Sequence, residues 1–336
     1  MERIRWGVIG AAGIAHKWMK GARQLADTHV VAVASRTKSS AEALAEAFGI
    51  PCVEDSVEAL LARDDVDAVY VATPHTSHCA LSFAAMEHGK AVLCEKIMAM
   101  NADEARRMFA CSQSMGRFLM EAMWTRCFPG LAEARALLES GAIGTLRSIR
   151  ASFAFNASVD GEHRLLNPAY GGGALLDVGV YCLHLCDVLL HQKPTEVHSF
   201  ARLSESGAID VQDSIIARYP GDMLAELTCA VKCDMGAGAK LYGSEGSISF
   251  PVFCAPTELI LRRNGKPEER RAFPVPNTDP AFTDDGYQYE IAHVNQCLRD
   301  GRIESPEVTA QATLNVLETC DALRQSWGLR YAADRR

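Results

Sequence analysis

Two groups of residues in this 336-residue chain have the types and spacing needed for proton transfer. The first is Glu95-Lys96, which directly follows the apolar run Ala91–Cys94. A lysine that hydrogen-bonds a substrate oxygen, or whose pKa is lowered by its surroundings, is an acid–base group. The alternative is that these two charged residues merely begin a solvated loop.

The second group is Asp177, Tyr181 and His184, which are spaced at i, i+4 and i+7. In an α-helix these positions fall within roughly 60° of one another around the axis. The neighbouring residues are apolar, so we expect the polar face to be buried or to line a cleft, where each group needs a partner. A satisfied buried network is the alternative to a catalytic role.

A turn of small residues near the N-terminus has the pattern of a dinucleotide-binding site. The strand-like run Ile4–Ile9 leads into Gly10-Ala11-Ala12-Gly13-Ile14-Ala15. A pyrophosphate binds at such a turn because backbone N–H groups and the helix dipole point at it. Ala12 stands where the fingerprint has its second glycine, so a plain tight turn is the alternative. The predicted phosphate contacts are Gly10, Ala12, Gly13 and Ile14.

The residues after the second predicted strand indicate which dinucleotide binds. That strand ends at Ala34 and is followed by Ser35-Arg36-Thr37-Lys38, with no carboxylate for a ribose 2′-hydroxyl. A hydroxyl and a guanidinium suit a 2′-phosphate, because arginine pairs bidentately with anions. We therefore predict NADP rather than NAD. A helix start capped by Ser39 is the alternative, but it does not explain the missing acid.

Polar residues also follow the third predicted strand, Ala68–Ala72. They are Thr73, Pro74 and His75. Open α/β sheets bind ligands outside the carboxyl ends of their strands, so we predict cofactor contacts for these residues and for Glu95 and Lys96. A structural role is the alternative for His75 and for His78.

The elements that position these groups divide the chain in two. The first 120 residues alternate β-branched runs with helical patterns, which is typical of βαβ units in a doubly wound parallel sheet. After Glu121, strand-like runs follow one another and favour a large, open, mostly antiparallel sheet with helices on one face. We expect a Rossmann domain over residues 1–121 and an α+β domain over 122–336.

The strands predicted in the first part are Ile4–Ile9, Val30–Ala34, Ala68–Ala72, Ala91–Cys94 and Phe118–Met120, and the helices are Ile14–Leu25, Ser39–Phe48, Ser77–His88 and Ala102–Met115. In the second part the predicted strands are Leu146–Phe155, Glu196–Arg202, Asp213–Tyr219, Leu224–Val231, Lys240–Tyr242, Ser247–Phe250 and Glu258–Arg262, and the helices are Leu131–Ser140, one from Ala174, Tyr287–Arg299 and Pro306–Gln325.

Composition excludes several other classes of protein. The net charge of −8 argues against nucleic acid as a partner, which requires a basic face. We find no segment apolar enough to cross a bilayer and no signal peptide, so we expect a cytoplasmic protein without a membrane partner. The 12 cysteines show no disulfide framework, and we expect no metal site at Cys182, His184 and Cys186, because the histidine points to another face of the helix.

Several motifs, in order, resemble the glucose-fructose oxidoreductase/inositol dehydrogenase (Gfo/Idh/MocA) family over essentially the full length. They are GVIGAAGIA, ASRT, VYVATPHTSHCALSFAAMEHGKAVLCEK, GGGALLDVGVYCLH and SPEVTAQATLNVLETCDALRQSWGLRY. Within the family, MEAMWTRCFP at Met120–Pro129 is most similar to the dimeric dihydrodiol dehydrogenases and the NADP-dependent D-xylose dehydrogenases.

The resemblance implies roles for residues of both parts. It implies that Lys96 is the catalytic lysine, that Tyr181 acts with it as acid–base, and that Asp177 and His184 are its polar companions. It further implies substrate contacts from Glu121, Trp124 and Arg126, the NADP-selecting pair Ser35 and Arg36, and a homodimer formed through the C-terminal sheet. One residue departs from the pattern, since Ile97 replaces the proline that follows the family lysine.

The predicted function is therefore NADP(H)-dependent hydride transfer to or from a carbon that carries a hydroxyl or carbonyl group, in a sugar or trans-dihydrodiol. Anhydrosugar or other keto-sugar reduction is an alternative within the same class. A non-catalytic NADP(H)-binding redox sensor or regulatory protein is the alternative from another class, and Ala12 and Ile97 are the features that favour it.

Overall fold

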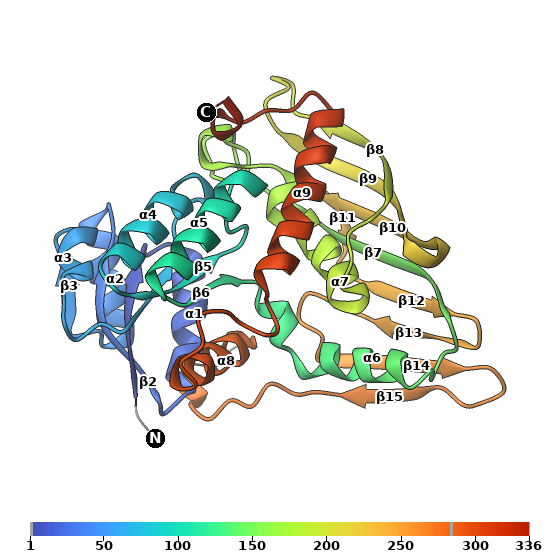
Figure 1. Cartoon of the computed structure of the whole chain (residues 1–336), viewed down its shortest axis with the longest axis horizontal. Coiled ribbons are helices and arrows are strands. Elements are labelled where there is room, and N and C mark those ends of the chain that lie inside the picture. Colours follow the sequence, from blue (N-terminus) through green and yellow to red (C-terminus); the bar gives the residue numbers. More distant parts are fainter. Residues whose placement is uncertain (1–2, 283–284, 336) are drawn as a thin grey trace. The chain divides into compact units, whose positions relative to one another are not determined.

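The computed structural model describes residues 3–282 and 285–335, which form two compact units (Figure 1). One unit contains Met1–Ala99, Asp103–Trp124 and Val275–Ala310, and the other contains Met100–Ala102, Thr125–Pro274 and Gln311–Arg336. The division at Trp124 lies close to the boundary expected at residues 121 and 122. The segment 275–310, which we expected in the second domain, groups with the first unit.

The first unit is built on a six-stranded sheet in which every pair is parallel, in the order β3-β2-β1-β4-β5-β6. Its strands are β1 (Ile4–Ile9), β2 (Thr28–Ala34), β3 (Cys52–Glu54), β4 (Ala68–Val71), β5 (Ala91–Glu95) and β6 (Leu119–Ala122). Its helices are α1 (Gly13–Arg23), α2 (Lys38–Phe48), α3 (Val57–Leu61), α4 (His75–Glu87), α5 (Ala102–Met115) and α8 (Tyr287–Arg299).

The register of this sheet brings the ends of its strands to one edge. Ile9 at the end of β1 lies opposite Ala34 of β2 and Val71 of β4. Val71 in turn lies opposite Cys94 of β5, and Cys94 lies opposite Glu121 of β6. The residues that follow these five strands therefore meet at the carboxyl edge of the sheet, as the sequence predicts.

The segment 275–310 is held in the first unit by buried hydrogen bonds. Helix α8 packs against α1 (Figure 1), and Trp6 Nε1 donates to Asn295 Oδ1 over 3.1 Å. The amide of Gln24 bonds the segment ahead of α8, where its Oε1 accepts from the N–H groups of Thr278 and Asp279. These contacts link residues more than 250 positions apart, which is why local sequence patterns did not reveal them.

The second unit contains a nine-stranded sheet in the order β15-β14-β13-β12-β7-β10-β9-β8, with β11 paired to β7. Only β7 and β10 pair in parallel among the described strands, and the other pairs are antiparallel. The predicted fold class is therefore confirmed for both parts. The strands are β7 (Leu146–Asn156), β8 (Glu196–Leu203), β9 (Asp210–Tyr219), β10 (Met223–Ala230), β11 (Lys232–Gly236), β12 (Ala239–Gly243), β13 (Gly246–Phe250), β14 (Glu258–Arg263) and β15 (Glu269–Ala272), and the helices are α6 (Pro129–Glu139), α7 (Val180–Leu190) and α9 (Ala310–Ser326).

The prediction that no segment is apolar enough to cross a bilayer was wrong. The stretch Pro168–Leu190 meets the criteria of length and composition, and an 18-residue window within it has a mean hydropathy of 1.7. Within the fold, however, 89% of this window is buried, and α7 packs on β7 and β10. An apolar helix of this kind is also what the core of a two-layer domain requires, so the stretch is weak evidence for a membrane span.

The start of this apolar helix is anchored by a pair of buried carboxyl groups. Asp210 Oδ2 accepts from Leu175 N over 2.5 Å, and the side chain of Asp213 lies against that of Asp210. Burial and the neighbouring Asp210 raise the pKa of Asp213 to about 10. Two carboxylates cannot both be charged at such a site, so the pair retains a proton at neutral pH.

Replacing Asp213 with Asn should change how stability depends on pH. In the wild type the folded state keeps a proton that the unfolded chain, with an ordinary pKa near 3.9, has already released. Stability should therefore fall as pH rises between that value and about 10. As pH rises from 5 to 9, we expect the free energy of unfolding of Asp213→Asn, measured relative to that of the wild type, to increase by up to about 1.4 kcal/mol per pH unit.

Urea unfolding at several pH values would measure this gain. Asp234→Asn, which changes an exposed carboxylate on β11, is the control and should run parallel to the wild type. Parallel profiles for Asp213→Asn and the wild type would show that the buried pair carries no extra proton.

Candidate active site

The turn after β1 has the backbone of a dinucleotide-binding loop. Gly10 has a φ of +99°, and a Cβ at this position would collide with the carbonyl oxygen of Ala72. Only glycine fits such a position, because of both its conformation and the close approach of the backbone. Ala12 precedes α1 as an extended residue with no side-chain cap, and its side chain is exposed.

Gly13, the first residue of α1, is not required by the protein's own packing. Its φ lies outside the left-handed region, and a Cβ built on it would meet no atom within 4 Å. The missing side chain instead leaves open space at the amino end of an 11-residue helix, where N–H groups lack partners within the helix. Such a cradle suits a pyrophosphate, so the residues of this turn fit the predicted dinucleotide.

The two cations after β2 differ in their contacts. Lys38 is tied to Asp55 by an ion pair of 2.6 Å, and this pairing raises the pKa of Lys38. Arg36 is exposed, and within the described ranges it has no hydrogen bond or ion pair. Ser35 is half-buried at the strand end. The guanidinium of Arg36 is therefore available to an anion at the position where the sequence predicts a 2′-phosphate.

The turn after β4 connects to the loop after β5 through His78. Pro74 precedes α4 as an extended residue, and Ser77 Oγ donates to Thr73 Oγ1 over 2.8 Å. His75 is buried, with its ring 5.7 Å from that of His78. His78 has Nε2 2.8 Å from Thr73 O and Nδ1 2.9 Å from Ile97 O, and burial lowers its pKa. His78 thus bonds backbone groups.

Glu95 and Lys96 do not begin a solvated loop. Glu95 is buried, accepts from the Tyr70 hydroxyl over 2.5 Å, and accepts from Lys96 N over 3.1 Å. Lys96 is half-buried, and the residues directly after it, Ile97 and Met98, are fully buried. The lysine therefore leaves the sheet edge at the start of a buried segment. The Lys96–Ile97 peptide bond is cis.

Glu121 and Trp124, predicted substrate contacts, are tied into the first unit. Glu121 at 1% exposure accepts from Met98 N over 3.0 Å. Trp124 stacks on Tyr287 of α8, with ring centroids 4.3 Å apart and planes 3° from parallel. The structure gives both residues roles within the protein that the sequence did not indicate.

The helix that carries Asp177, Tyr181 and His184 is not a regular α-helix throughout. Leu175–Gly179 form a π-helical turn, and the α-helix α7 begins at Val180. The estimate that the three groups lie within about 60° assumed a regular α-helix, and a π turn widens the spacing per turn. Single π turns of this kind occur frequently at functional sites.

Each of these three side chains is buried and has contacts within the second unit. Asp177 Oδ1 accepts from the half-exposed Arg164 over 3.0 Å. The ring of Tyr181 meets Phe153 edge-to-face, with centroids 5.1 Å apart. His184 is 2% exposed and has its Nδ1 3.4 Å from the guanidinium of Arg126.

Arg126, also a predicted substrate contact, forms the centre of a buried network. Its Nη1 donates to Asp187 Oδ2 over 2.9 Å, with both side chains at most 5% exposed. Asn315 of α9 donates to the other oxygen of Asp187, also over 2.9 Å. Because arginine only donates, Nδ1 of His184 must accept, and the proton of a neutral His184 then sits on Nε2.

Sequence reasoning missed Asp187 and Arg164 as members of this site. Asp187 continues the polar face at i+10 from Asp177, and that spacing was visible in the sequence. Arg164 lies in the loop before the helix, and no sequence pattern marks its contact. No group of three or more His, Cys, Asp or Glu in the described part of the chain could hold a metal ion.

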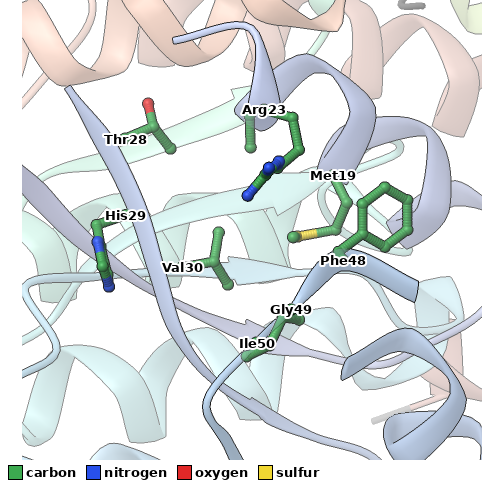
Figure 2. A pocket seen from close by; sticks show the side chains of 9 residues that line it. Met19, Arg23, Thr28, His29, Val30, Phe48, Gly49 and Ile50 are labelled. Atoms are coloured by element: carbon green, nitrogen blue, oxygen red, sulfur yellow. The ribbon is translucent and has the colours of Figure 1, made fainter. Parts of the chain in front are cut away.

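A small pocket in the first unit lies away from these residues. It is lined by Met19, Arg23, Thr28, His29 and Phe48, among others, and has a volume of about 110 Å³ (Figure 2). Thr28 begins β2, so the pocket is at the opposite end of that strand from Ser35. Ligand pockets usually measure roughly 300–1,000 Å³, and this one is too small for a dinucleotide.

Comparisons with known proteins agree with the geometry. Residues 4–123 match the model of the Gfo/Idh/MocA oxidoreductase family, described as an NAD-binding Rossmann fold, and residues 131–249 match the family's C-terminal domain. Trans-1,2-dihydrobenzene-1,2-diol dehydrogenase from Mus musculus is 36% identical over 99% of both chains.

Two solved structures show the same architecture. A 3-ketoreductase from Actinomadura kijaniata, in complex with NADP and TDP-benzene, has a TM-score of 0.84 and 29% identity and covers 96% of this chain and 98% of its own. The aldose-aldose oxidoreductase from Caulobacter crescentus has a TM-score of 0.87 but 23% identity, covers 97% and 98%, and shows the fold alone. The predicted family and the predicted oxidoreductase class are confirmed, and the chain belongs to the Gfo/Idh/MocA oxidoreductase family.

Proposed function

We propose that this chain is an NADP(H)-dependent dehydrogenase or reductase that acts on a hydroxyl- or carbonyl-bearing carbon of a sugar or a trans-dihydrodiol. The observation that carries the proposal is 36% identity, over 99% of both chains, to a relative named for its action on a dihydrodiol. The ketoreductase neighbour, solved with NADP, supports NADP as the cofactor and a carbonyl-bearing carbon as the reacting group.

The choice of NADP rests on Arg36. Its exposed guanidinium follows β2, while the neighbouring Lys38 is already paired with Asp55. A guanidinium recognises a phosphate through two parallel charge-assisted hydrogen bonds, and no carboxylate stands at this turn to favour a free ribose hydroxyl. Gly10, Ala12, Gly13 and Ile14 would hold the pyrophosphate, and Thr73, Pro74, His75, Glu95 and Lys96 would border the rest of the cofactor.

In the proposed mechanism, NADP(H), when bound, would supply the hydride chemistry. Tyr181 removes the hydroxyl proton during oxidation and returns it during reduction. The ammonium group of Lys96 stabilises negative charge that develops on the substrate oxygen. Asp177 and His184 orient the substrate, and His184 does so as an Nε2–H donor because Arg126 donates to Nδ1.

Other observations support the choice of Lys96 and Tyr181. The ketoreductase neighbour has also been solved with a tyrosine changed to phenylalanine and with a lysine changed to alanine. In this chain, the hydrogen bond to Met98 N fixes the backbone just beyond Ile97. The substitution of proline by Ile97 therefore does not leave the lysine on a loose loop, which weighs against a sensor that has lost its catalytic site.

We also propose that the chain forms a cytoplasmic homodimer through the outer face of the nine-stranded sheet. On that face Phe200 is 87% exposed and Ile216 is 56% exposed, which is unusual for large apolar side chains. They are flanked by the ion pairs Arg150–Glu226 and Arg218–Glu196, whose mixed charges suit a self-complementary contact. All 12 cysteines are free, as expected in a reducing compartment.

Replacing Tyr181 with Phe should remove turnover and leave cofactor binding intact, because the hydroxyl takes part only in proton transfer. We expect kcat to fall at least 100-fold, the lower end of the usual contribution of general acid–base catalysis. Absorbance at the nicotinamide band with a panel of diols and sugars measures turnover, and NADPH fluorescence measures binding. Tyr242→Phe, on β12 of the sheet, is the control. Unchanged turnover of Tyr181→Phe would refute the assignment, and NADPH binding by a wild type that turns over no substrate would favour the sensor.

Replacing Arg36 with Ala should weaken NADPH binding specifically. Hydrogen bonds to charged groups contribute about 1.5–3 kcal/mol, so the Kd for NADPH should rise at least about tenfold while that for NADH stays nearly constant. Lys38→Ala removes a nearby cation that is already paired with Asp55, and it should change the Kd for NADPH much less. Equal loss of affinity for NADH and NADPH would contradict 2′-phosphate recognition by Arg36.

Replacing Phe200 with Glu should produce a monomer, because a charge would be buried without a partner in the proposed interface. Light scattering after size-exclusion chromatography measures the mass against 36.5 kDa for one chain. Met115→Glu changes an exposed apolar residue of the first unit and should leave the dimer intact. A monomeric wild type, or a dimeric Phe200→Glu variant, would contradict the proposed interface.

A further inference from the structure

A single peptide group next to Lys96 is held at both ends by buried ionisable side chains. The carbonyl oxygen of Ile97 lies 2.9 Å from Nδ1 of His78, and the N–H of Met98 donates to Oε1 of Glu121 over 3.0 Å. Ile97 O and Met98 N belong to the same peptide bond. Its donor is thus bonded by the Glu121 carboxylate, and its acceptor lies within hydrogen-bond distance of the His78 ring.

The two holding side chains come from different elements of the first unit. His78 lies in the first turn of α4, is fully buried, and also has Nε2 2.8 Å from Thr73 O in the turn after β4. Glu121 lies on β6, at the other side of β5, and is 1% exposed. The peptide is therefore contacted from helix α4 and from strand β6.

The charges around His78 constrain how it acts. Glu121 faces it from β6, Lys96 faces it from the end of β5, and His75 lies beside it on α4. A neutral imidazole carries one proton and donates to one carbonyl at a time. The hydrogen bond from Met98 N to Glu121 does not have this restriction, because an ionised carboxylate only accepts.

We infer that His78 and Glu121 are positioning residues for Lys96, which they act on by fixing the Ile97–Met98 peptide. This inference rests on the proposed function, in which Lys96 is the catalytic lysine. It gives Glu121 a task other than the substrate contact that the sequence predicts. A shift of about 1 Å in a catalytic group can cost about 100-fold in rate, so loss of the contacts between these side chains and the Ile97–Met98 peptide should lower kcat measurably.

The experiment compares Glu121→Ala with Glu121→Gln in the full-length protein. Glutamine keeps an oxygen that accepts from Met98 N but loses the charge, whereas alanine loses both. We expect Glu121→Ala to lower kcat about 10- to 100-fold and to speed hydrogen exchange in peptides covering residues 96–100. Glu121→Gln should restore protection and keep kcat within about threefold of the wild type.

His78→Ala should speed exchange in the same peptides and lower kcat. Ser82→Ala removes a buried hydroxyl one turn further along α4 and is the matched control, for which neither readout should change. Loss of turnover in Glu121→Gln with wild-type protection would overturn the inference and point to a direct role for the charge. Unchanged exchange in Glu121→Ala would also overturn it. Absence of turnover in the wild type would refute the proposed function, while the exchange data would still decide whether His78 and Glu121 hold the Ile97–Met98 peptide in place.

Discussion

The backbone that follows β5 must enter the protein interior directly after the strand ends, and its polar groups then need partners there. β5 is buried along its whole length, and the residues from Ile97 to Met100 are also buried. Unpaired N–H and C=O groups in such a place would be costly. Glu95 accepts from Lys96 N, Glu121 accepts from Met98 N, and the His78 ring lies within hydrogen-bond distance of Ile97 O. The position of the lysine depends on these three side chains.

Buried polar groups of the second unit, including its candidate residues, also need hydrogen-bond partners. His184 lies beside Arg126, which is neutralised by Asp187, and Asp187 is in turn bonded by Asn315. A buried charge is tolerated only when it is paired in this way. The hydrogen bonds therefore fix both the ring position and the location of its proton. In both units, chemistry-bearing groups rest on buried polar networks rather than on surface loops, which is how pre-organised sites are held.

Much of the fold follows from local patterns. The strand at Ile4–Ile9 and the helices at Ala102–Met115 and Tyr287–Arg299 have the predicted bounds, because long periodic segments between clear breakers specify their own structure. The short strands β3, β11 and β15 were missed, since three to five residues carry little periodicity. The apolar character of Pro168–Leu190 was missed, since the stretch meets the length and composition criteria of a membrane span although it is buried in the fold.

The site was predictable in part. Strand ends mark the positions of Gly10, Arg36 and Lys96, because parallel strands bring their carboxyl ends to one edge. The partners of Glu121 and Arg126 could not be predicted. Their hydrogen bonds span 23 and 61 residues and depend on the direction in which each side chain leaves the backbone. The π-helical turn that contains Asp177 likewise has no local signature in the sequence.

A crystal structure of the ternary complex with NADP⁺ and a diol that the enzyme oxidises would test the central claim most directly. The account predicts that Lys96 Nζ and Tyr181 Oη both lie within hydrogen-bond distance, about 3 Å, of one substrate oxygen, whose carbon faces the nicotinamide. A complex in which the two side chains contact different molecules, or in which the reacting carbon is bordered by neither of them, would contradict it.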